Sequence, residues 1–207
     1  MSVASLTGAA AYLCEGQSIR IGLPELSEYD RIIQLRNSPQ LLRWSFDTAP
    51  VDSGAIWVQM RFGIGRPYAV LLAIRDKDLN HLLGMVGWYN WDQNASTAWL
   101  GQLVLDPLAM RPIIARRQRN GISIGLDAGC TLRDYLFLRL NLQTIFTYHL
   151  AGNTASERIT LAAGFDIYDR MHVARSDGSR VDITLTRIDR SKWESLGMHA
   201  ISIGSGP

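Results

Sequence analysis

The fold is decided by residues 96–165, whose most informative segments read AWLGQLVL (98–105), RRQRNGIS (116–123) and LQTIFTYHL (142–150). The first and third segments are apolar runs, and each predicts a strand. The second is a basic turn that contains Gly121 and leads into a helix predicted from Ile122 to about Phe137. A second helix is predicted to open at Asn153 and to close before Gly164-Phe165.

A basic, glycine-containing turn between a strand and a helix is suited to binding a phosphate group. The first N–H groups of a helix have no partner within it and point outward, and the helix dipole adds partial positive charge there. Gly121 allows the backbone to approach a ligand closely. We therefore expect residues 116–123 to bind an anion, although the same residues also fit a solvated basic turn.

The composition is that of one globular domain. The chain has 207 residues, of which 47% are hydrophobic and 19% are charged, and this length is sufficient to bury a full core. The formal net charge of +2 argues against a nucleic-acid-coating protein, which would carry a large basic excess. We expect a single domain over 1–207, in which 1–17 is a weakly ordered extension and 197–207 a weakly ordered tail.

The cysteines and the apolar runs exclude several classes of protein. Cys14 and Cys130 provide neither a disulfide framework nor the spacing of a metal site. No apolar run is long enough to span a membrane, and the N-terminus lacks the basic and apolar segments of a signal peptide. We therefore expect a cytoplasmic protein with no metal, no membrane partner and no nucleic-acid partner.

The rest of the chain supplies the outer elements of the fold. Further strands are predicted at 18–23, 68–75, 82–91, 166–174 and 180–188, and further helices from Ser27 and at 53–62. The turns at 76–80 and 176–179 have the residue types of hairpin turns. This order of elements predicts an α/β (α+β) fold, in which helices cover a mixed, largely antiparallel sheet.

That order, together with three sequence segments, resembles the GCN5-related N-acetyltransferase (GNAT) superfamily. QRNGIS at 118–123 resembles the pyrophosphate-binding pattern of the family. NTASER at 153–158, followed by AGF at 163–165, resembles the helix after the fifth strand. Residues 19–38 and the closing hairpin resemble the branch that contains ribosomal-protein N-terminal and amino-sugar N-acetyltransferases.

The resemblance implies a central sheet of about seven strands that is splayed between its fourth and fifth strands, here 98–105 and 142–150. One departure from the family lies between the fourth strand and the glycine turn. There, residues 106–115 form an insertion with two prolines, Pro107 and Pro112, and we expect it to be a long loop.

The resemblance also implies acetyl-CoA or another acyl-CoA as the donor, with no metal. The pyrophosphate would lie on the amides near Gly121, and the pantetheine arm would run between the splayed strands. Asn153 would reach that arm with its side-chain amide. The cofactor-binding residues implied in this way are Leu103, Val104, Leu105, Gln118, Arg119, Asn120, Gly121, Ile122, Ser123, Asn153 and Arg158.

In the implied reaction a neutral amine attacks a thioester, so a base or a water path must take the proton of the amine. Ser156 occupies the position where some relatives in the ribosomal-protein branch place a serine acid. The family often has a glutamate on the fourth strand, but residues 96–105 contain no carboxylate. Asp106 and His149 are therefore the candidate bases, with Tyr148 or a water chain as alternatives. A backbone N–H of the fourth strand would stabilise the oxyanion.

Four aromatic residues fall where the family builds its acceptor pocket: Trp44, Phe46, Trp88 and Tyr89. An aromatic pocket with few charges would suit an apolar or sugar-like acceptor. The predicted function is an acyl-CoA-dependent N-acyltransferase, acting on a primary amine of a small molecule or on a protein N-terminus. The alternative is a non-catalytic acyl-CoA-binding or sensing module, which the missing glutamate keeps open. A homodimer is compatible with either function.

Overall fold

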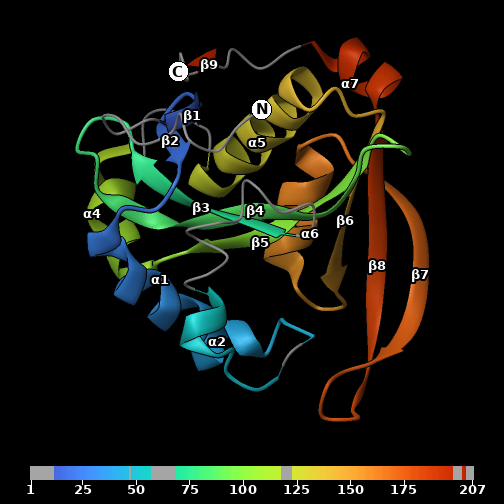
Figure 1. Cartoon of the computed structure of the whole chain (residues 1–207), viewed down its shortest axis with the longest axis horizontal. Helices are drawn as coiled ribbons and strands as arrows, with labels where there is room; N and C mark the ends of the chain where they lie inside the picture. The colour runs from blue at the N-terminus through green and yellow to red at the C-terminus, as the bar shows by residue number, and fades with distance from the viewer. Residues whose placement is uncertain (1–11, 47, 57–68, 118–122, 198–201, 204–207) are drawn as a thin grey trace.

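Figure 1 shows the computed structural model of the chain, which describes residues 12–46, 48–56, 69–117, 123–197 and 202–203. The predicted helix at 53–62 is helical at 53–56. Its remainder and residues 118–122 of the glycine turn lie outside the described residues.

The described residues form one nine-stranded sheet with the strand order β7-β8-β6-β5-β4-β3-β2-β1-β9. In chain order the strands are β1 Tyr12–Glu15, β2 Ile19–Gly22, β3 Ala69–Asp76, β4 Leu82–Asp92, β5 Thr97–Leu105, β6 Thr144–Leu150, β7 Asp166–Ala174, β8 Arg180–Asp189 and β9 Ser202–Ile203. β5 and β6 pair in parallel, whereas the other neighbouring strands pair antiparallel. The largely antiparallel sheet is therefore confirmed.

Both ends of the chain contribute a strand that the sequence did not predict. β1 pairs with β2, and β9 pairs with β1 at the edge of the sheet. The turn after β1 is attached to helix α5, because Asp127 accepts hydrogen bonds from the N–H groups of Gln17 and Ser18 at 3.0 and 2.7 Å. This partner lies more than a hundred residues away, so the local sequence pattern of the extension gave no sign of it.

Helices cover both faces of the sheet (Figure 1). In chain order they are a 3-10 turn at Leu26–Glu28, α1 Tyr29–Arg36, α2 Pro39–Leu42, α4 Pro107–Arg117, α5 Ile124–Arg139, α6 Thr154–Ala162 and α7 Arg190–Leu196. None of the helices in the described ranges is long and apolar enough to cross a membrane.

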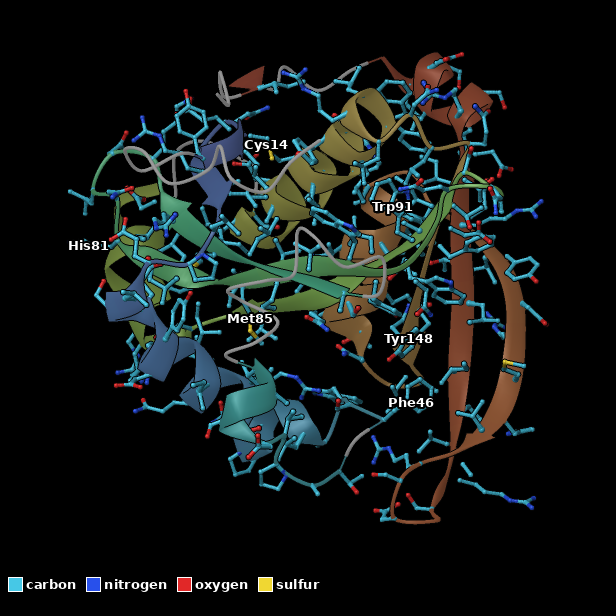
Figure 2. All side chains as sticks on the ribbon, viewed as in Figure 1. Cys14, Phe46, His81, Met85, Trp91 and Tyr148 are labelled. Atoms are coloured by element: carbon cyan, nitrogen blue, oxygen red, sulfur yellow. The ribbon has the colours of Figure 1, made fainter. Side chains whose placement is uncertain are left out.

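The alternation of the central strands divides the core into two layers. On β3, Leu72 joins the cluster beneath α5 together with Cys14, whereas its neighbour Leu71 joins the cluster against α1 together with Met85. Figure 2 shows Cys14 and Met85 on these two faces of the sheet. Since successive strand residues point to opposite faces, a strand buried on both faces is a nearly continuous apolar run, as β3 is.

Residues 106–115 were predicted to be a loop, but all of them after Asp106 belong to the helix α4. Asp106 begins this helix by accepting a hydrogen bond from the N–H of Leu108 on its side-chain oxygen at 2.9 Å, and the N–H of Met110 bonds to its carbonyl at 3.0 Å. Pro107 occupies the first helical position, which proline tolerates well. Pro112 lies in the helix interior, where proline is disfavoured, and this residue made the segment look like a loop.

A buried polar network joins α5, α6 and α7. Arg133 and Asp134 are an ion pair with 2.6 Å between Nη2 and Oδ1, and both side chains are almost fully buried. Asp134 accepts the indole N–H of Trp193 at 2.7 Å, and Arg133 donates to the carbonyl of Ala163 at the end of α6. Because α6 forms one wall of the site described below, this network fixes the position of that wall.

We expect Asp134→Asn to destabilise the protein by about 3–5 kcal/mol, because it leaves the buried Arg133 guanidinium without a counter-charge. The matched variant Asp166→Asn breaks an exposed ion pair with Lys192 and should change stability by less than about 1 kcal/mol. Urea unfolding monitored by tryptophan fluorescence measures both. Equal effects of the two variants would contradict the role assigned to the network.

Candidate active site

The parallel strands β5 and β6 separate part of the way along their length. They pair at Thr97–Thr144, Ala98–Ile145 and Trp99–Phe146. After the pair Trp99–Phe146, β5 continues to Leu105 and β6 continues to Leu150, and no further residues of the two strands pair with each other. The predicted splay between these two strands is therefore confirmed. It leaves backbone N–H and C=O groups of β5 facing a gap instead of a neighbouring strand.

A bulge in β5 lies beside this gap. Met85 pairs with Val104 and Gly87 with Gly101, so Gln102 and Leu103 together stand opposite one residue of β4. Gln102 has a φ of +56°, which is uncommon for a residue with a side chain. A bulge bends the strand and takes one residue out of the ladder. Strain of this kind gathers at functional sites.

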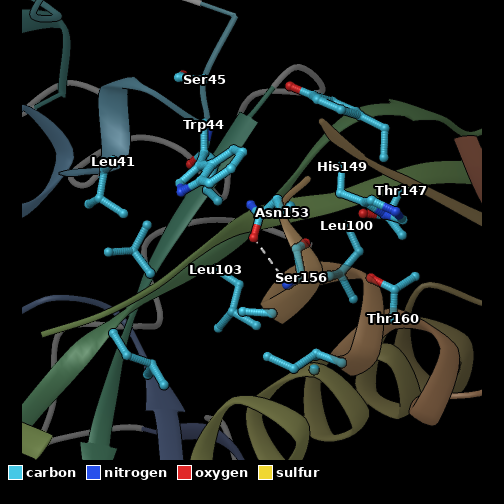
Figure 3. A pocket seen from close by; sticks show the side chains of 18 of the residues that line it. Leu41, Trp44, Ser45, Leu100, Leu103, Thr147, His149, Asn153, Ser156 and Thr160 are labelled. Atoms are coloured by element: carbon cyan, nitrogen blue, oxygen red, sulfur yellow. Dashed lines mark hydrogen bonds between the residues drawn. The ribbon is translucent and has the colours of Figure 1, made fainter. Parts of the chain in front are cut away.

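A cavity of about 570 Å³ occupies the gap (Figure 3). Of the residues predicted for the site, those that line it are Trp44, Phe46, Tyr89, Leu103, Val104, Leu105, His149, Asn153 and Ser156. These residues come from the segment after α2, from β4, β5 and β6, and from the start of α6. The structure thus brings together two of the three predicted catalytic residues, three of the four acceptor residues and four of the eleven cofactor residues.

The N-terminus of α6 opens onto the cavity. Asn153 caps this helix, since its Oδ1 accepts a hydrogen bond from the N–H of Ser156 at 3.2 Å (Figure 3). The Ser156 side chain is half-buried and Thr160, one turn later, is buried; both line the cavity. The cap uses only the oxygen of Asn153, so its amide nitrogen remains available to a ligand in the cavity.

One glycine of α5 allows α6 to approach closely. A Cβ on Gly125 would lie 2.7 Å from Cδ1 of Ile159, so a side chain there would require Ile159 to shift. A Cβ on Gly129 would lie 3.5 Å from Cγ2 of Ile159, which is an ordinary contact distance. Gly129 and Ile159 both line the cavity, so the packing of α5 against α6 bounds the cavity on this side.

His149 is 4% exposed and lines the cavity from β6. Its Nδ1 is buried and has no hydrogen-bond partner among the described residues. Burial lowers the pKa of His149; the negative charge of Glu157 opposes this shift and the positive charge of Arg170 adds to it. The side chain is therefore neutral near pH 7 and able to accept a proton.

Asp106, the other predicted base, does not line the cavity and has a structural role instead. Its Oδ2 lies 2.7 Å from Nε and 2.6 Å from Nη2 of Arg31. Burial alone would raise the pKa of Asp106, but hydrogen bonds from Arg31 and from the N–H groups of Leu108 and Ala109 outweigh it, and the pKa lies below its usual range. A carboxylate held in this way is a weak base.

Two further predicted site residues lie away from the cavity lining. Trp88 is 5% exposed and packs in the core, 6.2 Å from Tyr135 of α5 between ring centroids. It follows the alternation of β4, which directs Trp88 and Tyr89 to opposite faces. Trp88 is therefore a core residue and not an acceptor-pocket residue. Arg158 is exposed on α6 and remains only a candidate for a phosphate contact outside the cavity.

The predicted phosphate turn at 116–123 is described only at its two ends. Arg116 and Arg117 are not in a turn, because they form the end of the helix α4. Gln118, Arg119, Asn120, Gly121 and Ile122 lie outside the described residues. Ser123 is the N-cap of α5, and its Oγ accepts a hydrogen bond from the N–H of Leu126 at 3.2 Å. The predicted change from turn to helix thus occurs at Ser123, but the phosphate site itself stays a prediction.

Aromatic rings form the wall of the cavity opposite α6. The centroid of Tyr148 lies 4.8 Å from that of Phe46 and 6.3 Å from that of Trp99, and Trp99 lies 6.2 Å from Tyr89. Trp99, which was not among the predicted site residues, does not itself line the cavity, but its ring contacts those of Tyr89 and Tyr148, which do. The alternation of β5 could have identified this contact, because it places Trp99 and Gly101 on the same face of the sheet as Tyr89. A Cβ on Gly101 would lie 2.9 Å from Cε1 of Tyr89, so glycine leaves room for that ring.

Comparisons with known proteins agree with this geometry. The model of the acetyltransferase (GNAT) domain matches residues 19–166. Spermidine N-acetyltransferase from Vibrio cholerae, solved with CoA and spermine, is similar with a TM-score of 0.67 and 17% identity, over 85% of this chain and 98% of that one. A GCN5-related N-acetyltransferase from Brucella melitensis has a TM-score of 0.67 and 17% identity, over 92% and 83%.

A Vibrio cholerae protein provisionally named ribosomal-protein-serine acetyltransferase has a TM-score of 0.63 and 18% identity, over 84% of this chain and 95% of that one. At such identities these likenesses show the fold. No curated protein sequence matches the chain significantly. The described residues contain no group of three or more histidine, cysteine, aspartate or glutamate side chains that could hold a metal ion.

We expect Asp106→Asn to reduce stability by about 1–2 kcal/mol at neutral pH through the loss of the Arg31 pair. Because the folded-state pKa of Asp106 lies below the unfolded value of about 3.9, this stabilisation is present above that value and disappears as the pH falls through the folded-state pKa. Urea unfolding of both proteins at neutral pH and at about pH 3 measures the difference. A stability gap that is unchanged in acid would contradict this prediction.

Proposed function

Because the chain belongs to the acetyltransferase (GNAT) family, we propose that it is an acetyl-CoA-dependent N-acetyltransferase that acts on a primary amine. The observation that carries this proposal is the gap between β5 and β6, which places a bulged strand, a capped helix N-terminus and a buried histidine around one cavity. The finer assignments below, to individual residues and to the acceptor, are part of the proposal.

The gap fits the pantetheine arm of an acyl-CoA. This arm is a narrow chain with two amide groups, and the backbone of Leu103, Val104 and Leu105 offers N–H and C=O groups that β6 leaves unpaired. Asn153 would add its amide nitrogen from the opposite wall. The diphosphate would lie at the N-terminus of α5, where unpaired N–H groups and the helix dipole favour an anion, with Arg158 available for an outer phosphate.

Ser156 is the residue proposed to protonate the departing thiolate. It lines the cavity beside Asn153, and its hydroxyl is not needed for the helix cap, which uses its backbone N–H. One turn later the chain has Thr160, which is buried and shorter than the tyrosine found there in many family members. A hydroxyl at the helix N-terminus is also favoured as a donor to a developing negative charge.

The bulge of β5 is proposed to stabilise the negative charge that develops on the thioester oxygen. Backbone N–H groups that are fixed before the reaction are effective in this role, because they need no reorganisation. Gln102 and Leu103 are the two residues of the bulge that stand opposite a single residue of β4. They line the cavity on the same side as the pantetheine segment.

His149 is proposed to take the proton of the attacking amine, directly or through water. Of the described residues that line the cavity, it is the one whose side chain titrates nearest to neutral pH. It also lines a second cavity of about 420 Å³, together with Glu157, Arg170 and His172. This arrangement gives the proton a path from the reaction site towards the surface.

The alternative function, a non-catalytic acyl-CoA-binding module, shares the same gap and differs only in chemistry. The assay that separates the two measures CoA release from acetyl-CoA in the presence of a panel of primary amines. Amine-dependent release supports the transferase. Binding of acetyl-CoA by calorimetry, with no release above the amine-free rate for any amine, supports the module.

We expect Ser156→Ala to lower kcat by about 10²-fold, the lower limit for a lost general acid, while the Kd for acetyl-CoA changes little. The cap of α6 does not use the Ser156 hydroxyl, so the variant should fold. Ser191→Ala, an exposed serine of α7, is the matched control and should leave kcat unchanged. A kcat of Ser156→Ala equal to that of the wild type would remove Ser156 from the mechanism.

We expect His149→Gln to lower kcat by about 10²-fold and to abolish the acidic limb of the pH profile. In the wild type that limb should have a midpoint below about 6.5, the ordinary value for histidine, because burial lowers the pKa. Steady-state rates across the pH range measure this, and added imidazole should partly restore the variant through the second cavity. An unchanged profile in the variant would point to a water chain as the proton acceptor.

A further inference from the structure

The aromatic end of the cavity has a composition that discriminates among amines. We propose that the acceptor is a small primary monoamine carried on a flat apolar body, and not a polyamine or a protein N-terminus. This inference rests on the proposed acetyltransferase function and adds the chemical class of the acceptor to it. Three features of the described residues support it.

The first feature is a continuous wall of rings. Phe46, Tyr89 and Tyr148 line the cavity, and Trp99, which does not, connects the rings of Tyr89 and Tyr148. Each of the four rings lies within 6.3 Å of another, measured between centroids. Figure 2 shows Phe46 and Tyr148 close together, although they come from different ends of the fold. Aromatic side chains favour flat apolar partners in stacked or edge-on contact. Burial and the neighbouring Tyr148 also raise the pKa of Tyr89, so its phenol stays protonated and uncharged.

The second feature is the absence of negative charge among the described residues that line the cavity. Among the described residues that line the cavity there is no aspartate or glutamate, and Arg36 is the one residue with a formal charge. Outside the described ranges the sequence contains a single acidic residue, Asp47. A monoamine loses its charge when it is deprotonated for attack. A polyamine keeps a second ammonium group, which would be buried without a carboxylate partner, and burial of an unpaired charge is unfavourable.

The third feature is a tether that holds the ring wall in place. The N–H of Ser176, in the turn between β7 and β8, donates to the carbonyl of Phe46 at 3.2 Å, and the Oγ of Ser176 accepts from the N–H of Thr48 at 3.1 Å. Arg175 donates to the carbonyl of Arg43 in the same segment. A protein N-terminus needs an open groove for the chain that follows it. Here, hydrogen bonds attach the segment that carries Phe46 to the turn between β7 and β8.

The test measures the Kd of amines for the wild-type protein saturated with CoA, by calorimetry, so that binding is observed without turnover. The probes are 2-phenylethylamine, spermidine and a short peptide with a free N-terminal serine. We expect 2-phenylethylamine to bind at least about tenfold more tightly than either of the others, because stacking favours it and an unpaired ammonium disfavours spermidine.

Two matched variants test the charge argument. Gln40 lines the cavity and is exposed, so Gln40→Glu adds one carboxylate at a position where the fold should tolerate it. We expect this variant to bind spermidine about three- to tenfold more tightly than the wild type does, and 2-phenylethylamine no more tightly. Gln93→Glu adds the same charge in the exposed turn after β4 and should change neither Kd.

The outcomes separate this inference from the proposed function. The acceptor class would be overturned if spermidine or the peptide bound as tightly as 2-phenylethylamine. This holds whether or not Asp47→Asn abolishes that binding. The acceptor class would also be overturned if none of the three amines bound. Either result leaves the transferase assignment intact if acetyl-CoA is consumed with another amine. Selective binding of 2-phenylethylamine without any acetyl-CoA consumption would support the acceptor site and count against the transferase.

Discussion

Backbone N–H and C=O groups in the interior of a protein need hydrogen-bond partners, and between β5 and β6 the sheet stops providing them after Trp99. A sheet interrupted in its centre would be unstable unless other elements held the two halves at a fixed separation. Here the first three residue pairs hold one end, and α5 and α6 lie across the gap on one face. The cavity is thus a consequence of strand geometry, and a ligand with its own amides is the natural substitute for the missing strand.

The rest of the molecule fixes the walls of that gap. The ion pair of Arg133 and Asp134 connects α5 with the end of α6 and with Trp193. Gly125 of α5 then leaves room for the side chain of Ile159. On the opposite side, the contacts of Ser176 with Phe46 and Thr48 hold the ring wall. The α6 side and the ring-wall side of the cavity are therefore supported by different contacts.

Local patterns were sufficient to predict the elements around the gap. The apolar runs of β5 and β6, the cap at Asn153 and the hairpin turn between β7 and β8 are short-range signals, and each appears in the structure. The pattern failed where a distant partner decides the outcome. β1 depends on Asp127 and on β2, and the carboxylate of Asp106 pairs with Arg31, so neither contact could be seen in the neighbouring residues.

Periodicity also explains the one misplaced pocket residue, because Trp88 and Tyr89 differ only in which face of β4 they occupy. The tether between residues 43–48 and the β7–β8 turn joins segments about 130 positions apart. During synthesis on the ribosome, the described cavity lining up to Phe165 emerges before Arg175 and Ser176, which form this tether. A nascent chain would therefore have the lining residues outside the exit tunnel before the contacts that hold the ring wall can form.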